Sequence, residues 1–203
     1  MKLYGAPMPA PNPRRVRIFL AEKGIDLPET PVNMMQREHK SPDHKARNSL
    51  GQVPTLELDD GTCISETVAI CRYFEETQPD PPLFGRTPVE KALVDMWVRR
   101  TEFTVMMPVG AFWRHAHPFT AKLLTQFKDY GESNRETYAG AQRWLDRELA
   151  GRSYVVGGDY TVADICLLTT VDFADWIGLP LLDDVQNLRA WHGRVSERPS
   201  SKA

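Results

Sequence analysis

The sequence predicts a mixed α/β domain followed by an all-helical domain. Strand-like and helix-like apolar patterns alternate as far as residue 77, three prolines in five residues follow at 78–82, and only helical periodicity is found after residue 87. Proline cannot continue a helix, so the proline-rich segment marks a linker. We therefore place the first domain at 1–78, the linker at 79–86 and the second domain at 87–203.

In the first domain, the order of elements predicts a βαβ unit followed by a ββα unit. Its first helix is expected to have Asn12 as N-cap and Pro13 at the first helical position, and to end at Gly24. Residues 34–50 are polar and irregular, which predicts a loop with at most one short helix. The remaining elements are expected to be strands at 2–6, 29–33, 54–58 and 62–64, a hairpin turn at 59–61 and a helix at 65–77.

In the second domain, a long helix is expected to run from 87 toward 117 and to be bent or broken near Pro108. Further helices are expected at 118–149, 161–176 and 184–196. Thr161 and Asp164 have the spacing of a capping box, in which each side chain serves the backbone amide of the other residue. We assign both residues to folding, because this carboxylate would satisfy backbone donors at the start of a buried helix.

Composition and charge exclude several classes of partner and binding site. The net charge is −2 and no basic block occurs, so neither nucleic acid nor an anionic membrane surface is an expected partner. No apolar stretch approaches the ~18 residues that a membrane span needs. The N-terminal segment lacks the apolar core of a signal peptide, and the three cysteines are scattered with no C-x-x-C pair. We therefore expect a cytoplasmic protein with reduced thiols and without a metal site.

Two motifs predict a binding site for a short peptide. In Gly51-Gln52-Val53-Pro54, the proline keeps Val53 extended, and a cis bond would leave the backbone amide and carbonyl of this strand edge free for a ligand. In Ser65-Glu66-Thr67, a helix begins, and its unpaired N–H groups can bind a carboxylate. One edge would then pair with the backbone of the peptide, and the helix end would bind its acidic terminus.

These two motifs, together with the segment Gly158-Asp159-Tyr160-Thr161-Val162-Ala163-Asp164, resemble those of the cytosolic glutathione transferases of bacterial type, over essentially the whole chain. The resemblance implies an α/β N-terminal thioredoxin-like domain followed by an all-α helical bundle, and a homodimer. It also implies a detoxification enzyme that activates glutathione as a thiolate for attack on small hydrophobic electrophiles. Glutathione would be the cosubstrate, with no other bound cofactor.

Carried over by position, the resemblance implies roles in binding glutathione. Val53, supported by the structural Pro54, would pair its backbone with the cysteinyl residue, and Gln52 would add a polar contact. Glu66 and Thr67 would hold the γ-glutamyl end, with simple helix capping as the alternative. Lys40, with His39 beside it, would meet the glycyl carboxylate, with a solvated loop lysine as the alternative.

The resemblance is weakest at the catalytic position. No hydroxyl or thiol side chain lies between Gly5 and Pro13, where many members of the family place a Tyr, Ser or Cys. Asn12 matches the asparagine of nu-class-like bacterial members, and its amide could donate to the thiolate. The alternative role for Asn12 is the helix cap alone.

The electrophile pocket implied by the resemblance would lie between the domains. Its expected lining residues are Met8, Pro9, Phe103, Met106, Met107 and Trp113. The alternative for the helical members is an ordinary apolar core. Two other functions stay open: a glutathione-dependent disulfide oxidoreductase, and a non-catalytic glutathione-binding module.

Overall fold

The computed structural model describes residues 1–7 and 9–203 and divides into two compact units. The first contains Met1–Phe84 together with Pro199–Ala203, and the second contains Gly85–Arg198. Residues 199–203 thus belong with the first unit, whereas the sequence pattern placed them in the second domain. The reason is a contact with the first helix: the guanidinium of Arg14 donates to the carbonyl of Ser201 at 2.7 Å.

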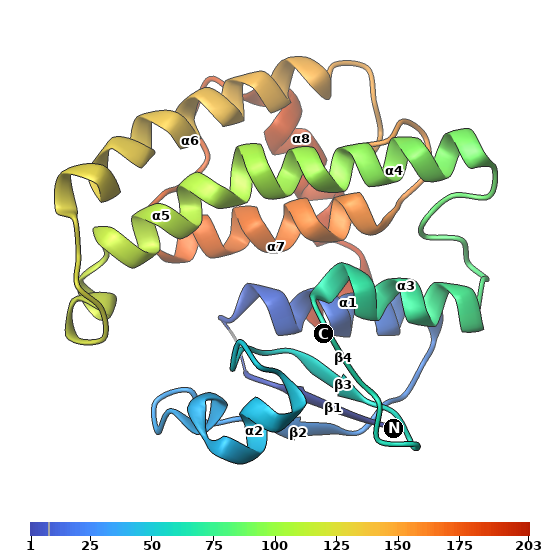
Figure 1. The fold of residues 1–203 in the computed structure, drawn as a ribbon. Helices are drawn as coiled ribbons and strands as arrows, with labels where there is room; N and C mark the ends of the chain where they lie inside the picture. The colour runs from blue at the N-terminus through green and yellow to red at the C-terminus, as the bar shows by residue number, and fades with distance from the viewer. Residues whose placement is uncertain (8) are drawn as a thin grey trace. The chain divides into compact units, whose positions relative to one another are not determined.

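The first unit is built on a four-stranded mixed sheet (Figure 1). Its strands are β1 (Lys2–Gly5), β2 (Glu29–Pro31), β3 (Thr55–Glu57) and β4 (Cys63–Ser65), in the spatial order β2-β1-β3-β4. β1 is parallel to β2 and antiparallel to β3, which is antiparallel to β4. The longer helices of this unit are α1 (Pro11–Lys23) and α3 (Thr67–Thr77). The predicted α/β thioredoxin-like fold of the N-terminal part is confirmed.

The two faces of the sheet carry different side chains. Leu3 and Leu56 are paired across β1 and β3 and are fully buried, on the face that α1 and α3 cover (Figure 1). On the other face, the hydroxyl of Tyr4 donates to Glu57 at 2.8 Å, and the guanidinium of Arg47 binds the same carboxylate at 3.0 Å. Arg47 ends the short helix α2 (Pro42–Arg47), so this polar contact attaches α2 to the sheet.

The strand register brings three chain segments to one end of the sheet. Tyr4 pairs with Thr55, and Thr55 pairs with Ser65. The residues just outside these pairs are Pro54 before β3 and Glu66 after β4, so both lie at the end of the sheet where β1 leads into α1. The cis Val53–Pro54 bond and the start of α3 therefore lie close together.

One local prediction in the first unit was wrong. Helix α1 has Ala10 as its N-cap, so Asn12 lies inside the first turn and does not cap the helix. Pro11 explains the earlier start, because the first helical position needs no N–H. The stretch at 34–50 is a loop with one short α-helix, as expected. This helix is α2, whose N-cap Ser41 accepts a hydrogen bond from the His44 amide, and the 3₁₀ turn η1 (Glu38–Lys40) precedes it.

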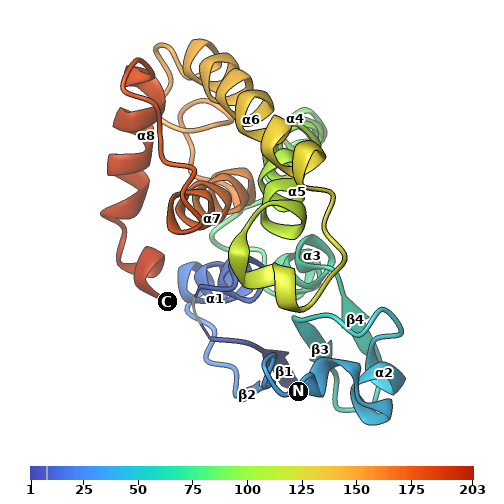
Figure 2. The same cartoon turned by 90° about the vertical axis from the view of Figure 1, so that its left-hand side faces the viewer.

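The second unit is helical (Figure 2). The predicted all-α fold of this part is confirmed. Helix α7 lies among the others, and its residues from Val162 to Val171 are all buried, which explains why most of this stretch is apolar. No helix within the described part of the chain is apolar over a length that could cross a bilayer. The elements are α4 (Pro88–Arg100), a π-helical segment (Thr101–Met106), α5 (Met107–His115), η3 (Pro118–Lys122), α6 (Lys128–Glu148), α7 (Val162–Trp176) and α8 (Gln186–Ser196).

In this unit one helix is interrupted near Pro108, as the sequence predicts, and another begins later than expected. The long helix is interrupted by the π-helical segment just before Pro108. Pro108 cannot donate to the carbonyl four residues earlier, and the wider π turn accommodates that loss. Pro118 starts only the short η3, with the His117 ring accepting from the amide of Phe119, so α6 begins at Lys128 instead of 118.

Candidate functional site

The candidate site lies in the first unit, at the sheet end defined by the register. Val53 is half-buried and precedes the first residue pair of β3, and among the described residues its backbone forms no hydrogen bond with another backbone group. The side chain of Gln52 is exposed beside it. An extended residue with unpaired amide and carbonyl groups can pair with the backbone of a ligand, as an added strand does.

Lys40 holds the backbone that leads to Val53. Its ammonium donates to the carbonyls of Leu50 and Gly51, at 2.9 and 2.7 Å, although the residue as a whole is exposed. An ammonium has three donors, so one stays available for an anion. Lys40 is therefore attached to the candidate site and is not a freely solvated loop lysine.

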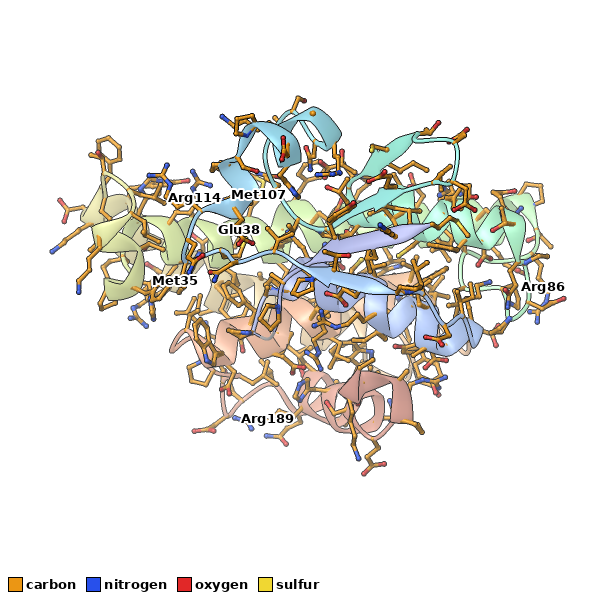
Figure 3. The ribbon with its side chains drawn as sticks, turned by 90° about the horizontal axis from the view of Figure 1, so that it is seen from below. Met35, Glu38, Arg86, Met107, Arg114 and Arg189 are labelled. Carbon is orange, nitrogen blue, oxygen red and sulfur yellow. The ribbon has the colours of Figure 1, made fainter. Side chains whose placement is uncertain are left out.

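The backbone around Lys40 is held in one conformation by neighbouring residues. Gly51 has φ +57°, and a Cβ atom at this position would lie 2.6 Å from the carbonyl oxygen of His39, so only glycine fits. Glu38, labelled with Met35 in Figure 3, accepts a hydrogen bond from the Asn33 amide at 2.7 Å and so closes the turn before Lys40. Burial, followed by the charge of Lys40, lowers the pKa of His39.

The start of α3 supplies the second part of the site. Glu66 is the N-cap with φ +69°, an uncommon value for a residue other than glycine, and its side chain makes no capping hydrogen bond. Capping therefore does not explain the glutamate, and the strained backbone is a feature that often accompanies binding sites. Thr67 is buried beside it, and the N–H groups of the first turn can bind a carboxylate.

Asn12 lies in the first turn of α1, half-buried, at the same end of the sheet. Because Ala10 is the N-cap, the amide of Asn12 is not needed for capping and can donate to a negatively charged group. Tyr4, the nearest phenol in sequence, is engaged on the other face with Glu57. That hydrogen bond, and burial, raise the pKa of Tyr4, so it is unsuited to stabilise a thiolate here.

The residues expected to line an electrophile pocket are divided between the units. Pro9 is half-buried in the first unit, and Met8 lies outside the described residues. Phe103 and Met107 belong to the helical unit and are 63% and 59% exposed, so the alternative that they form an ordinary core is wrong. Met107 lies on α5, as Figure 3 shows, and Met106 is half-buried.

Trp113 belongs to a cluster of aromatic rings on the helical unit. Its ring stacks on Phe119 with centroids 5.4 Å apart and meets Trp176 at 5.6 Å. Phe119 and Trp176 are 43% and 51% exposed, so the cluster presents ring faces on the surface of this unit. Such a surface can bind an apolar or planar aromatic molecule. The other two rings of the cluster are Phe173 and His117.

Sequence reasoning missed two residues that contact the site. The imidazole of His44 and the amide of Asn48 both bind the carbonyl of Gln52, at 2.8 and 3.0 Å. Both residues fell in the stretch that was expected to be an irregular loop. The pair Ser41-Pro42, a helix N-cap followed by proline, was the available signal for the helix that places them.

In the described part of this thioredoxin-like unit, the backbone of Val53 without a backbone partner and the start of α3 lie at one end of the sheet, and such groups can bind a short anionic peptide. Comparisons with known proteins agree: the glutathione S-transferase N-terminal domain matches residues 1–76, and the glutathione S-transferase C-terminal domain matches residues 105–199. Glutathione S-transferase 2 of Saccharomyces cerevisiae is 37% identical over 206 residues, which cover 100% of this chain and 88% of the relative.

Solved structures give the same result. The crystal structure of Gtt2 from Saccharomyces cerevisiae matches with a TM-score of 0.92 at 36% identity, covering 100% of this chain and 99% of that one. A glutathione S-transferase domain-containing protein of Marinobacter aquaeolei matches with a TM-score of 0.91 at 37% identity, covering 98% and 99% of the two chains. The chain belongs to the glutathione S-transferase family, and the predicted function as a glutathione transferase, an enzyme of the transferase class, is confirmed at the level of the family.

Proposed function

We propose that the first unit binds glutathione and lowers the pKa of its thiol, so that the thiolate attacks a small hydrophobic electrophile. One observation carries the proposal: the unpaired backbone of Val53 and the unpaired N–H groups at the start of α3 lie at the same end of the sheet. A short peptide with an extended cysteinyl residue and a free terminal carboxylate matches both features.

Each part of glutathione has a proposed partner. Val53 pairs with the backbone of the cysteinyl residue, and Gln52 adds a polar contact. Thr67 and the first N–H groups of α3 bind the γ-glutamyl carboxylate, and the exposed carboxylate of Glu66 accepts from the γ-glutamyl ammonium. The remaining donor of Lys40 meets the glycyl carboxylate.

In the reaction, the cysteinyl sulfur loses its proton to water and attacks an electrophilic carbon. A sulfur–carbon bond forms, and the leaving group departs with its electron pair. Asn12 and the positive end of α1 stabilise the thiolate, since the amide N–H donates to sulfur and the helix N-terminus favours negative charge. The protein further contributes proximity, by holding both reactants.

Replacement Asn12→Ala is expected to raise the pKa of the bound thiol by about one unit, because one hydrogen bond to the thiolate is lost. Stability should change little, since Asn12 does not cap α1. The ultraviolet absorbance of the thiolate, followed across pH with glutathione bound, measures the pKa, and urea unfolding measures stability. An unchanged thiol pKa in the variant would remove Asn12 from the mechanism.

The same thiolate could attack a disulfide. Attack on one sulfur forms a mixed disulfide with glutathione and releases the other sulfur as a thiolate. This second candidate function, a glutathione-dependent disulfide oxidoreductase, is favoured by the absence of any hydroxyl or thiol between Gly5 and Pro13, since glutathione itself would be the redox thiol. The product distinguishes the two functions: conjugation gives a thioether, whereas exchange gives a reduced disulfide. Glutathione binding with neither product would indicate a non-catalytic module.

Three finer features belong to this proposal. The electrophile is a small hydrophobic molecule, a class supported by the exposed Phe103 and Met107 and by the ring cluster around Trp113. The role is detoxification. The location is cytoplasmic, in keeping with the three free cysteines.

We expect the protein to be a homodimer, as the family resemblance implies. Val89 and Leu93, one turn apart on α4, are 69% and 41% exposed, and Leu50 in the first unit is 61% exposed, which leaves apolar surface for a second copy to cover. Sedimentation at micromolar concentration should give twice the mass of the chain, and Leu93→Glu should shift this toward one chain. A single-chain mass for the unaltered protein would contradict the prediction.

A further inference from the structure

Side chains from residues 40–48 bind all three carbonyls that precede Val53. Lys40 binds those of Leu50 and Gly51. The third, on Gln52, accepts from His44 Nε2 at 2.8 Å and Asn48 Nδ2 at 3.0 Å. A carbonyl oxygen only accepts, so His44 Nε2 carries the proton.

We propose that His44 and Asn48 are positioning residues of the glutathione site, which act on the ligand through the peptide group between Gln52 and Val53. That peptide group is planar and trans, so its C=O and N–H point in opposite directions. Hydrogen bonds that hold the carbonyl oxygen of Gln52 in place therefore also fix the direction of the Val53 N–H. In the proposed function, this N–H pairs with the backbone of the cysteinyl residue of glutathione. The inference rests on that proposed function.

The hydrogen bonds from His44 and Asn48 are needed to orient this peptide group, because Val53 lies before the paired part of β3. The strand ladder that fixes peptide planes begins at Thr55, so it does not orient the group that precedes Val53. The hydroxyl of Thr55 adds only a long contact to the carbonyl of Gln52, at 3.4 Å. The two shorter bonds come from helix α2 and its C-cap, which is attached to the sheet through Arg47.

Burial makes these two donors rigid. His44 is 4% exposed and Asn48 is 6% exposed, so water does not compete for the carbonyl of Gln52. Asn48 has additional contacts: its side-chain oxygen accepts from the Leu50 amide at 3.1 Å, and its Nδ2 donates to the hydroxyl of Thr55 at 3.2 Å. A change at Asn48 would disturb the whole loop, so His44 is the sharper residue for a test.

The test compares His44→Ala, His44→Gln and Lys45→Ala with the unaltered chain. Removing the imidazole should weaken glutathione binding about tenfold. The pKa of the bound thiol and kcat at saturating glutathione should stay unchanged, because Asn12 and α1 are untouched. His44→Gln keeps an N–H donor at similar reach and should restore most of the affinity. Lys45→Ala removes an exposed side chain from the same helix without touching Gln52, and should leave the affinity unchanged.

Calorimetry gives the affinities, the thiolate absorbance gives the pKa, and initial rates give kcat. Binding by His44→Ala as tight as by the unaltered chain would overturn the inference alone. Failure of His44→Gln to recover affinity, while Lys45→Ala binds normally, would also overturn it, because the N–H donor would not be the cause. Absence of glutathione binding by the unaltered chain would overturn the proposed function and this inference with it.

Discussion

Replacing Asp164 with alanine is expected to lower the free energy of unfolding by about 3–5 kcal/mol. The carboxylate is completely buried at the start of α7 and accepts from the backbone amides of Val155 and Thr161, at 2.9 and 3.0 Å. It also accepts from the indole of Trp191 at 2.9 Å. The variant would leave these three N–H donors buried without an acceptor. Urea unfolding measures the effect.

The matched control is Asp175→Ala, which removes an exposed carboxylate near the other end of the same helix. Its effect should lie within about 0.5 kcal/mol. A change at Asp164 as small as that at Asp175 would show that the four-residue contact does not stabilise the fold.

The stabilisation that Asp164 provides depends on pH and decreases as the pH rises. Burial raises the pKa of Asp164 from 3.8 to about 6, although the hydrogen bonds from Val155, Trp191 and Thr161 act in the opposite direction. The folded chain therefore holds this proton more tightly than the unfolded chain. The contribution of the group is greatest below pH 3.8 and declines as the pH rises toward 6. The stability difference between the unaltered chain and Asp164→Ala should narrow over this window.

Replacing Lys23 with alanine is expected to cost about 3–5 kcal/mol, because one partner of a buried ion pair is removed. The ammonium lies 2.6 Å from the carboxylate of Glu75, and the two side chains are 0% and 7% exposed. It also donates to the carbonyls of Gln78 and Pro81, at 2.9 and 2.5 Å. The variant leaves the charge of Glu75 uncompensated and releases the proline-rich segment from α1. Urea unfolding, or the thermal midpoint, measures the loss.

Two further variants test this explanation. Lys45→Ala removes an exposed lysine from α2 and should change stability by no more than about 0.5 kcal/mol. The double variant Lys23→Met with Glu75→Gln should be more stable than Lys23→Ala, since no buried charge is left alone. Equal effects at Lys23 and Lys45 would contradict the role of the ion pair.

Much of the fold could be predicted from the sequence because its signals are local. The turn at 59–61 and the proline-rich linker each depend on residues that are close in sequence, and such signals predict an α/β part followed by a helical part. The thioredoxin-like topology of the first part rested on the family resemblance. The late start of α6 was missed because Pro118 marks equally well the start of a 3₁₀ turn and of an α-helix. The start of α1 is predicted two residues too late, because an asparagine before a proline, as in Asn12-Pro13, is a strong cap signal.

The site was predicted less completely for a different physical reason. His44 and Asn48 bind a backbone carbonyl, and every residue type at position 52 has one, so no side chain in the sequence identifies the acceptor. The ion pair of Lys23 and Glu75 joins two helices far apart in the sequence, and no spacing rule connects them. The proline predicts an interruption near residue 108, but the π-helical form of the interruption depends on how the helix accommodates the missing donor.

Residues 199–203 pack with the first unit, and this affects when that unit can finish folding during synthesis of the chain. Ser201 binds Arg14 of α1, and Ser200 donates to Glu22 of the same helix. A ribosome releases the N-terminal half of a chain first, and that half usually folds as it emerges. Here the unit made first lacks part of its packing until residues 199–203 have left the exit tunnel. Its folding is therefore completed only after translation of the helical unit that follows it.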